Sequence, residues 1–163
     1  MTKLRDFWID LAPIFDGHSD DIQEIDLVNL TTGGMAEIVN YLLQHSKEGS
    51  TKFLIKGTDQ QVLFASPEMV INYLLQGQVT MAMWLTLPAL PMLSVYVDFA
   101  DEISFGYVRG EWNALAVLAF FNLIYELKGL CPQSQLRPSV YTYTNDEREL
   151  LMEFWQDYDH LEM

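Results

Sequence analysis

The chain has 163 residues, of which half are hydrophobic and 20% are charged, so we expect one folded domain over residues 1–163 and exclude intrinsic disorder. Its 23 acidic residues against 9 basic ones give a net charge of −14. This charge excludes a Lys/Arg surface for nucleic-acid phosphates and argues against an anionic membrane as partner. The single cysteine cannot form an internal disulfide and predicts a reducing, cytoplasmic compartment.

The N-terminal third predicts helices and strands in an irregular order. Apolar residues at helical spacing predict a helix over residues 4–15, and alternation of apolar and acidic residues predicts a half-buried strand over 22–30. We expect a second helix over 35–45. Two apolar runs, 53–56 and 62–65, are joined by a Gly-containing turn and predict a hairpin.

The middle of the chain has no charged residue between Glu68 and Asp98, a length that raises the question of a membrane span. The polar cluster at 76–78 divides this stretch into two shorter pieces. We therefore expect a helix before the cluster, with Ser66 as its N-cap, and a buried strand over 79–87. No membrane span is predicted.

The C-terminal part predicts a second hairpin, from alternating residues 93–99 and 103–108. Residues 114–125 are apolar except for Asn122, and they predict a largely buried central helix over 111–128. A short edge strand is expected over 140–144, followed by an amphipathic helix from residue 145. This order of elements predicts an α+β domain, with an antiparallel sheet and helices packed mainly on one face.

Patterns for catalysis or metal binding are weak in this sequence. His18, His45 and His160 are far apart and lack the spacing of metal ligands, and the acidic turn at 16–21 does not fit a calcium loop. Cys131 has no base near it in the sequence and is expected to be a passive thiol. We therefore predict a binding protein rather than an enzyme, with no catalytic residue, no metal site and no cofactor.

The pattern that does suggest a function is an acidic surface that carries aromatic side chains. Aromatic side chains supply buried area in an interface, and carboxylates steer and pair with a basic partner. The net charge also exceeds the ~2–8 that solubility asks of a small domain. Tyr96 and Asp98 share a face of one predicted strand, and Tyr141 and Tyr143 share a face of another. Acids crowd a hairpin turn and the last helix. The predicted partner-binding residues are Tyr96, Asp98, Asp101, Glu102, Tyr141, Tyr143, Asp146, Glu149, Glu153 and Asp157.

Three features together carry a resemblance to a known class. They are the acidic hairpin at 95–105, the following helix that begins with Glu111 and Trp112, and the acidic segment from Asp146. In this profile the chain resembles the small acidic immunity proteins of bacterial toxin systems. The resemblance implies a cytoplasmic protein that binds a cognate toxin domain, often basic, and blocks its active site or substrate channel.

The mechanism we expect is stoichiometric occlusion of a basic partner, such as a nuclease toxin. A toxin that cleaves nucleic acid must present Lys and Arg to phosphate, and an acidic protein can cover the same surface. Three alternatives remain open at this point. They are an enzyme or small-ligand protein with a pocket against helix 111–128, a DNA-mimic inhibitor, and a structural subunit of a larger assembly.

Overall fold

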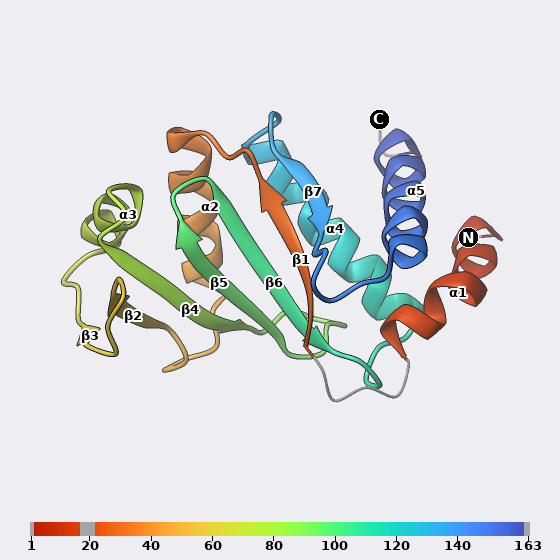
Figure 1. Ribbon diagram of the computed structural model, residues 1–163, viewed down its shortest axis with the longest axis horizontal. Helices are drawn as coiled ribbons and strands as arrows, with labels where there is room; N and C mark the ends of the chain where they lie inside the picture. Colours follow the sequence, from red (N-terminus) through yellow and green to blue (C-terminus); the bar gives the residue numbers. More distant parts are fainter. Residues whose placement is uncertain (1, 17–21, 162–163) are drawn as a thin grey trace.

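The computed structural model describes residues 2–16 and 22–161, which form one α+β unit (Figure 1). In chain order the elements are α1 (Thr2–Phe15), β1 (Ile22–Val28), α2 (Thr32–His45), β2 (Lys52–Ile55), β3 (Gln61–Val62), α3 (Pro67–Leu75), β4 (Val79–Leu85), β5 (Leu93–Phe99), β6 (Glu102–Val108), α4 (Ala114–Leu130), β7 (Gln135–Pro138) and α5 (Asn145–Leu161).

The strands form one antiparallel sheet in the order β3-β2-β4-β5-β6-β1-β7. Both predicted hairpins are present, as β2–β3 and β5–β6. The N-terminal strand β1 lies between β6 and β7, where Ile25 is opposite Phe105 on one side and Pro138 on the other. Opposite residues point to the same side of a sheet, so this register sets which side chains enter the core.

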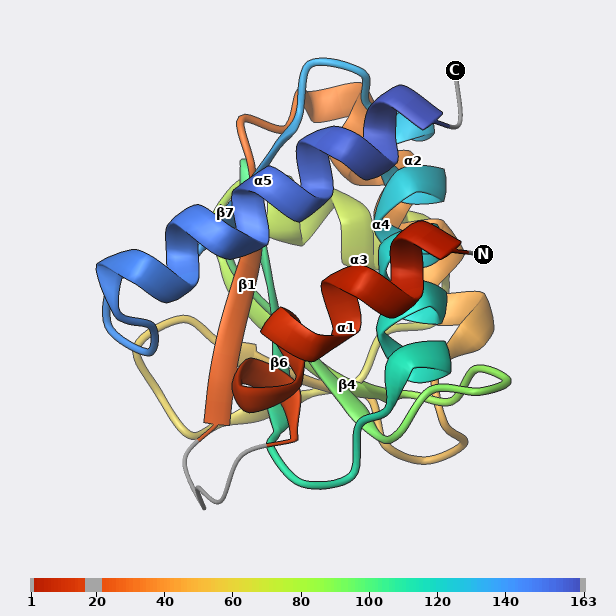
Figure 2. The same ribbon diagram turned by 90° about the vertical axis from the view of Figure 1, so that its right-hand side faces the viewer.

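The helices lie mainly on one side of the sheet, as the sequence predicted. In Figure 1, α2 and α4 are behind the strands, whereas α1 and α5 lie beyond β7; Figure 2 shows the same arrangement from the β7 end of the sheet. Helices α2 and α3 pack together over the β4 end, α4 lies in the middle, and α1 and α5 pack on α4 beyond β7. Among the described residues no helix covers the opposite side, which we call the open face.

The central helix is largely buried, as expected, but it begins later than predicted. Asn113 is its N-cap and accepts a hydrogen bond from the backbone N of Ala116, so Glu111 lies outside the helix. Trp112 is buried instead and packs against the rings of Phe15 and Tyr107. The helix continues through Gly129 to Leu130, beyond the predicted end at 128.

The predicted strand over 140–144 is wrong. The edge strand is β7, at 135–138, and the following residues turn back to begin α5. Thr144 and Glu147 form a reciprocal capping box, in which Thr144 N donates to Glu147 Oε1 at 2.9 Å and Glu147 N donates to Thr144 Oγ1 at 3.2 Å. The chain therefore turns at 140–144, where the sequence pattern indicated a strand, and α5 begins at Asn145, where a helix was predicted.

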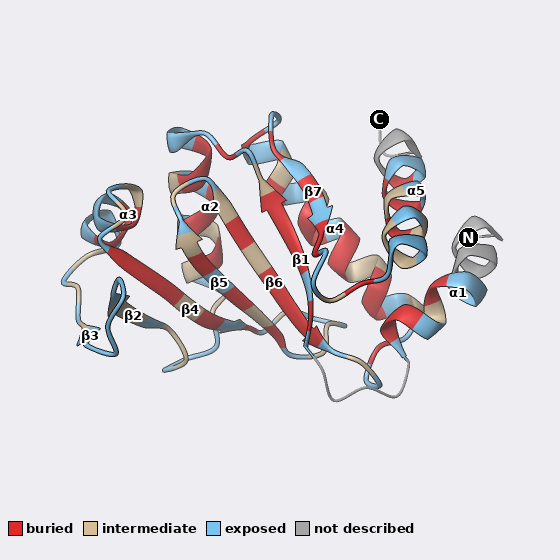
Figure 3. Ribbon diagram, viewed as in Figure 1, coloured by how far each residue is buried: buried red, intermediate tan, exposed pale blue. Residues whose placement is uncertain are grey.

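Burial alternates along the sheet strands, with core residues on the helix side and partly exposed residues on the open face (Figure 3).

Within the described ranges, no helix has the length and apolar character that crossing a bilayer requires.

Candidate functional site

The open face brings side chains from five strands into one surface. A single row runs across it: Ala82 is paired with Tyr96, Tyr96 with Ser104, Ser104 with Asp26, and Asp26 with Arg137. Neighbouring strands are about 4.8 Å apart, so this row is a continuous strip about 20 Å long. It has an aromatic end on β4 and β5 and an acidic end on β6, β1 and β7.

The aromatic end is built around Trp84 and Tyr96, whose side chains are 40% and 44% exposed. The sheet beside them is packed closely, because Ser94 Oγ donates to the carbonyl oxygen of Gly106 at 3.1 Å. A Cβ added at Gly106 would lie 2.4 Å from that Oγ and 3.0 Å from Cγ2 of Ile22. Because of these contacts, the sheet has no room for a side chain at Gly106.

The acidic end is organised by Arg137, which bridges two carboxylates. Its Nη2 donates to Asp26 Oδ2 at 3.1 Å and to Glu102 Oε1 at 2.9 Å. Glu24 lies two residues before Asp26 on the same side of β1. Burial, and secondarily the charge of Asp26, raises the pKa of Glu24 above its usual range.

A hollow of about 370 Å³ opens in this acidic end. We call it the acidic hollow. Tyr141, which is 94% exposed, stands on the turn after β7 and completes its wall. The lining residues are Glu24, Asp26, Glu102, Ser104, Arg137, Ser139, Val140 and Tyr141.

The Glu24→Gln variant is expected to be more stable than the wild type near neutral pH, by less than about 1 kcal/mol. The raised pKa means that ionised Glu24 is disfavoured in the folded state, so its contribution to stability falls as pH rises from about 4.3 through the folded-state pKa. Glutamine carries no charge at any pH, so the variant does not lose this stability as pH rises. Denaturant unfolding at about pH 4 and pH 7 measures the difference. A wild type that is the more stable protein at pH 7 contradicts the expectation.

The structure brings several predicted binding residues together. Tyr96, Asp98 and Glu102 point to the open face, and Tyr141 reaches it through the turn after β7. Asp101 is exposed on the β5–β6 turn, where its carbonyl oxygen accepts a hydrogen bond from Leu30 N at 3.0 Å. These five residues form one side of the molecule together with the acidic hollow.

Tyr143 does not belong to this surface, and its prediction as a binding residue is corrected here. It is only 6% exposed, because residues 140–144 form a turn rather than a strand. Its hydroxyl donates to Tyr107 Oη at 2.8 Å, and Tyr107 Oη donates to the carbonyl oxygen of Ile14 at 3.3 Å. Burial raises the pKa of both tyrosines, so the pair is a neutral structural link between α1, β6 and the turn before α5.

The predicted acids of the last helix form a second surface. Asp146, Glu149, Glu153 and Asp157 are all exposed along α5, whose opposite side is buried against α4 and α1. Figure 2 shows that α5 begins on the side of the open face and crosses beyond β7 to the side of the helices. The helix therefore extends the negative charge around the edge of the sheet without lining the acidic hollow.

Sequence reasoning missed Trp84, Glu24, Asp26 and Arg137 as site residues. A signal for the two acids was available, because they alternate with Ile25 and the other core residues of β1. Trp84 was hidden in a run of apolar residues that suggested a strand buried on both sides. Arg137 had no signal, since the strand that carries it was not predicted.

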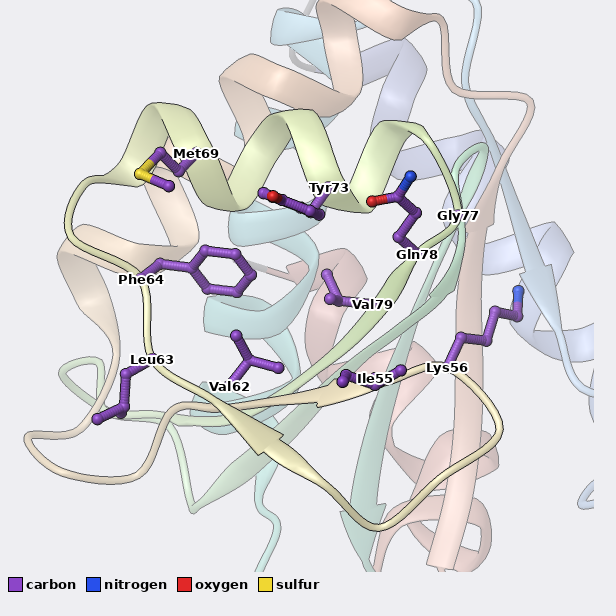
Figure 4. Close-up of a pocket in the computed structure, with 10 residues that line it drawn as sticks. All are labelled: Ile55, Lys56, Val62, Leu63, Phe64, Met69, Tyr73, Gly77, Gln78 and Val79. Atoms are coloured by element: carbon purple, nitrogen blue, oxygen red, sulfur yellow. The ribbon is translucent and has the colours of Figure 1, made fainter.

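A second hollow, of about 590 Å³, lies between α3 and the β2–β3 hairpin (Figure 4). Met69 and Tyr73 of α3 face Val62 and Phe64 across it, and its lining is mostly apolar. The Lys56 side chain points away from this space, and its Nζ donates to the carbonyl oxygen of Asp98 at 2.8 Å. We call this space the apolar hollow. Neither hollow is lined by a residue of α4, where the pocket of an enzyme was expected.

The remaining candidates for chemistry are accounted for by packing. His45 stacks on Tyr41 at 4.3 Å between ring centroids, and Cys131 is buried with Sγ 3.7 Å from Thr31 Oγ1. Residues 17–21, including His18, and the side chain of His160 lie outside what the structure describes. In the part that it does describe, no three His, Cys, Asp or Glu side chains are grouped so that they could hold a metal ion.

Comparison of the chain with protein-family models, with curated proteins and with solved structures gives no match. The functional inference therefore depends on the chemistry of the chain's own surfaces.

Proposed function

We propose that this chain is a non-enzymatic binding protein that neutralises a cognate basic protein, in the manner of an immunity protein against a bacterial toxin. The open face is the surface that covers the active or substrate-binding region of the partner. One observation carries the proposal: an uncovered sheet face joins half-exposed Trp84 and Tyr96 to the carboxylates of Glu24, Asp26 and Glu102.

This arrangement combines the two components of a specific interface for a basic partner. Tryptophan and tyrosine are enriched among the residues that contribute most to binding energy, and they contribute most when a partner excludes water from them. Carboxylates beside them select a partner that carries Lys and Arg.

The acidic surface on α5 contributes to the proposed function in a different way. Asp146, Glu149, Glu153 and Asp157 are exposed to solvent, so salt screens their charges strongly. Exposed charges at the rim of an interface change the rate of association more than the final affinity. With a net charge of −14, association with a basic partner reaches ~10⁸ M⁻¹s⁻¹ or above at low salt.

The test uses the purified chain and purified basic proteins encoded beside its gene. We expect a one-to-one complex that abolishes the partner's activity in proportion to the amount of chain added. Stopped-flow association at low and at high salt is expected to show a rate constant that falls at least about tenfold. An association rate that does not respond to salt, or inhibition far below one equivalent, contradicts the proposal.

The matched variants separate the two surfaces. Glu149→Gln with Glu153→Gln removes two charges from α5, and we expect slower association with little change in dissociation. Glu24→Gln with Glu102→Gln removes two charges from the open face, and we expect faster dissociation because these carboxylates become buried in the complex. Identical effects of the two pairs would contradict the assignment of the open face as the interface.

A further inference from the structure

We propose that the acidic hollow is a receptor for a guanidinium group, the side chain of an arginine on the partner. The identity of the partner rests on the function proposed above, whereas the affinity of the hollow for guanidinium is a property of this chain alone.

The charges around the hollow are unbalanced. Glu24, Asp26 and Glu102 contribute three carboxylates to its lining, and Arg137 contributes the one cationic side chain. Arg137 bonds one oxygen of Asp26 and one oxygen of Glu102, which fixes both carboxylates in place. Three negative charges against one positive charge leave a surplus of two negative charges, which favours a further cation.

Asp26 provides an independent indication of a missing donor. The residue is 6% exposed, and its Oδ1 is buried without a hydrogen-bond partner among the described residues. Buried carboxylate oxygens are normally satisfied, because leaving one unpaired costs the full desolvation penalty of the group. Asp26 lines the acidic hollow, so a donor that enters the hollow lies beside this carboxylate and can remove the penalty.

The shape and lining of the hollow favour guanidinium over other cations. The described acids do not form the three-ligand group that a metal ion needs. Glu24 and Asp26 are two residues apart on one side of β1, about 7 Å along the strand, and the planar fork of a guanidinium, with its five donors, can bond both carboxylates. The exposed ring of Tyr141 lies at the wall, where a guanidinium plane can stack.

The experiment titrates methylguanidinium into the full-length chain and follows backbone amide resonances by NMR. We expect saturable shifts at Ser104 and Tyr141, and little shift in α2. Glu24→Gln is expected to raise the dissociation constant for methylguanidinium about tenfold, because it removes a charged acceptor. Tyr141→Ala removes the stacking ring and is expected to raise the same dissociation constant about threefold. Both positions are exposed, so both variants are expected to fold.

Glu37→Gln is the matched control, because it removes the same charge from an exposed position on α2 and is expected to leave the titration unchanged. Shifts that do not saturate, shifts that sodium chloride reproduces, or equal affinity for methylammonium overturn the inference. Because methylguanidinium is the only ligand, these outcomes do not depend on the partner. Failure of the proposed function is observed separately, as a complex that is insensitive to substitutions on the open face.

Discussion

Replacing Trp84 and Tyr96 together by alanine is expected to weaken the complex with the basic partner by at least about 30-fold, equivalent to about 2 kcal/mol. The two rings are 40% and 44% exposed, so a partner that covers the open face buries the rest of both side chains. Calorimetric titration measures the loss. Each residue is more than half buried, so the cost to folding is expected to be about 1–2 kcal/mol, at up to about 1 kcal/mol for each cross-strand pair that is lost.

The matched control is Tyr73→Ala with Met69→Ala, which removes two side chains that are 38% and 43% exposed in the apolar hollow. We expect this pair to leave the affinity unchanged. A larger loss of affinity from the control pair than from the open-face pair would move the interface to the α3 side of the molecule. Dissociation rates distinguish an interface on the open face from one on the α3 side, because removing a buried aromatic side chain mainly speeds dissociation.

The parts of the fold that local chemistry determines were predictable. Ser66 caps α3 by accepting a hydrogen bond from Met69 N, as the Ser-Pro-Glu sequence indicated. The β5–β6 hairpin follows from strict alternation of apolar residues. In both cases the residues that decide the structure are neighbours in the sequence.

The prediction failed at residues 140–144 because tertiary contacts override local propensity there. Val140, Tyr141 and Tyr143 favour a strand, but the pairing position beside β1 is taken by β7. Ser139 N still donates to the carbonyl oxygen of Glu24 at 3.0 Å, and then Tyr143 N donates back to the carbonyl oxygen of Ser139 at 3.2 Å. This turn buries Tyr143, which the strand pattern would have exposed.

The candidate site was only partly predictable because strand order assembles it. Asp26 and Arg137 are separated by 111 residues in sequence, and Arg137 and Glu102 by 35. Only the insertion of β1 between β6 and β7 brings these three together. Composition indicated that acids and aromatics dominate the surface, while the pairing of strands decides which of them share a face.

Truncation of Phe121 to alanine is expected to lower the free energy of unfolding by about 3–5 kcal/mol, a large part of the ~5–15 kcal/mol of a typical domain. Phe121 is fully buried on α4, and its ring centroid lies 4.8 Å from that of Phe154 and 5.7 Å from that of Trp155, both on α5. Alanine leaves a cavity between the two helices. Urea unfolding followed by circular dichroism measures the loss.

The control on the same helix is Leu115→Ala, where the side chain is 66% exposed and the expected loss is within about 0.5 kcal/mol. A comparably small loss for Phe121→Ala would contradict the packing of α5 on α4. That packing also matters for the proposed interface, because the turn that carries Tyr141 to the acidic hollow runs directly into α5. Loosening α5 is therefore expected to weaken methylguanidinium binding as well, although Phe121 lines neither hollow.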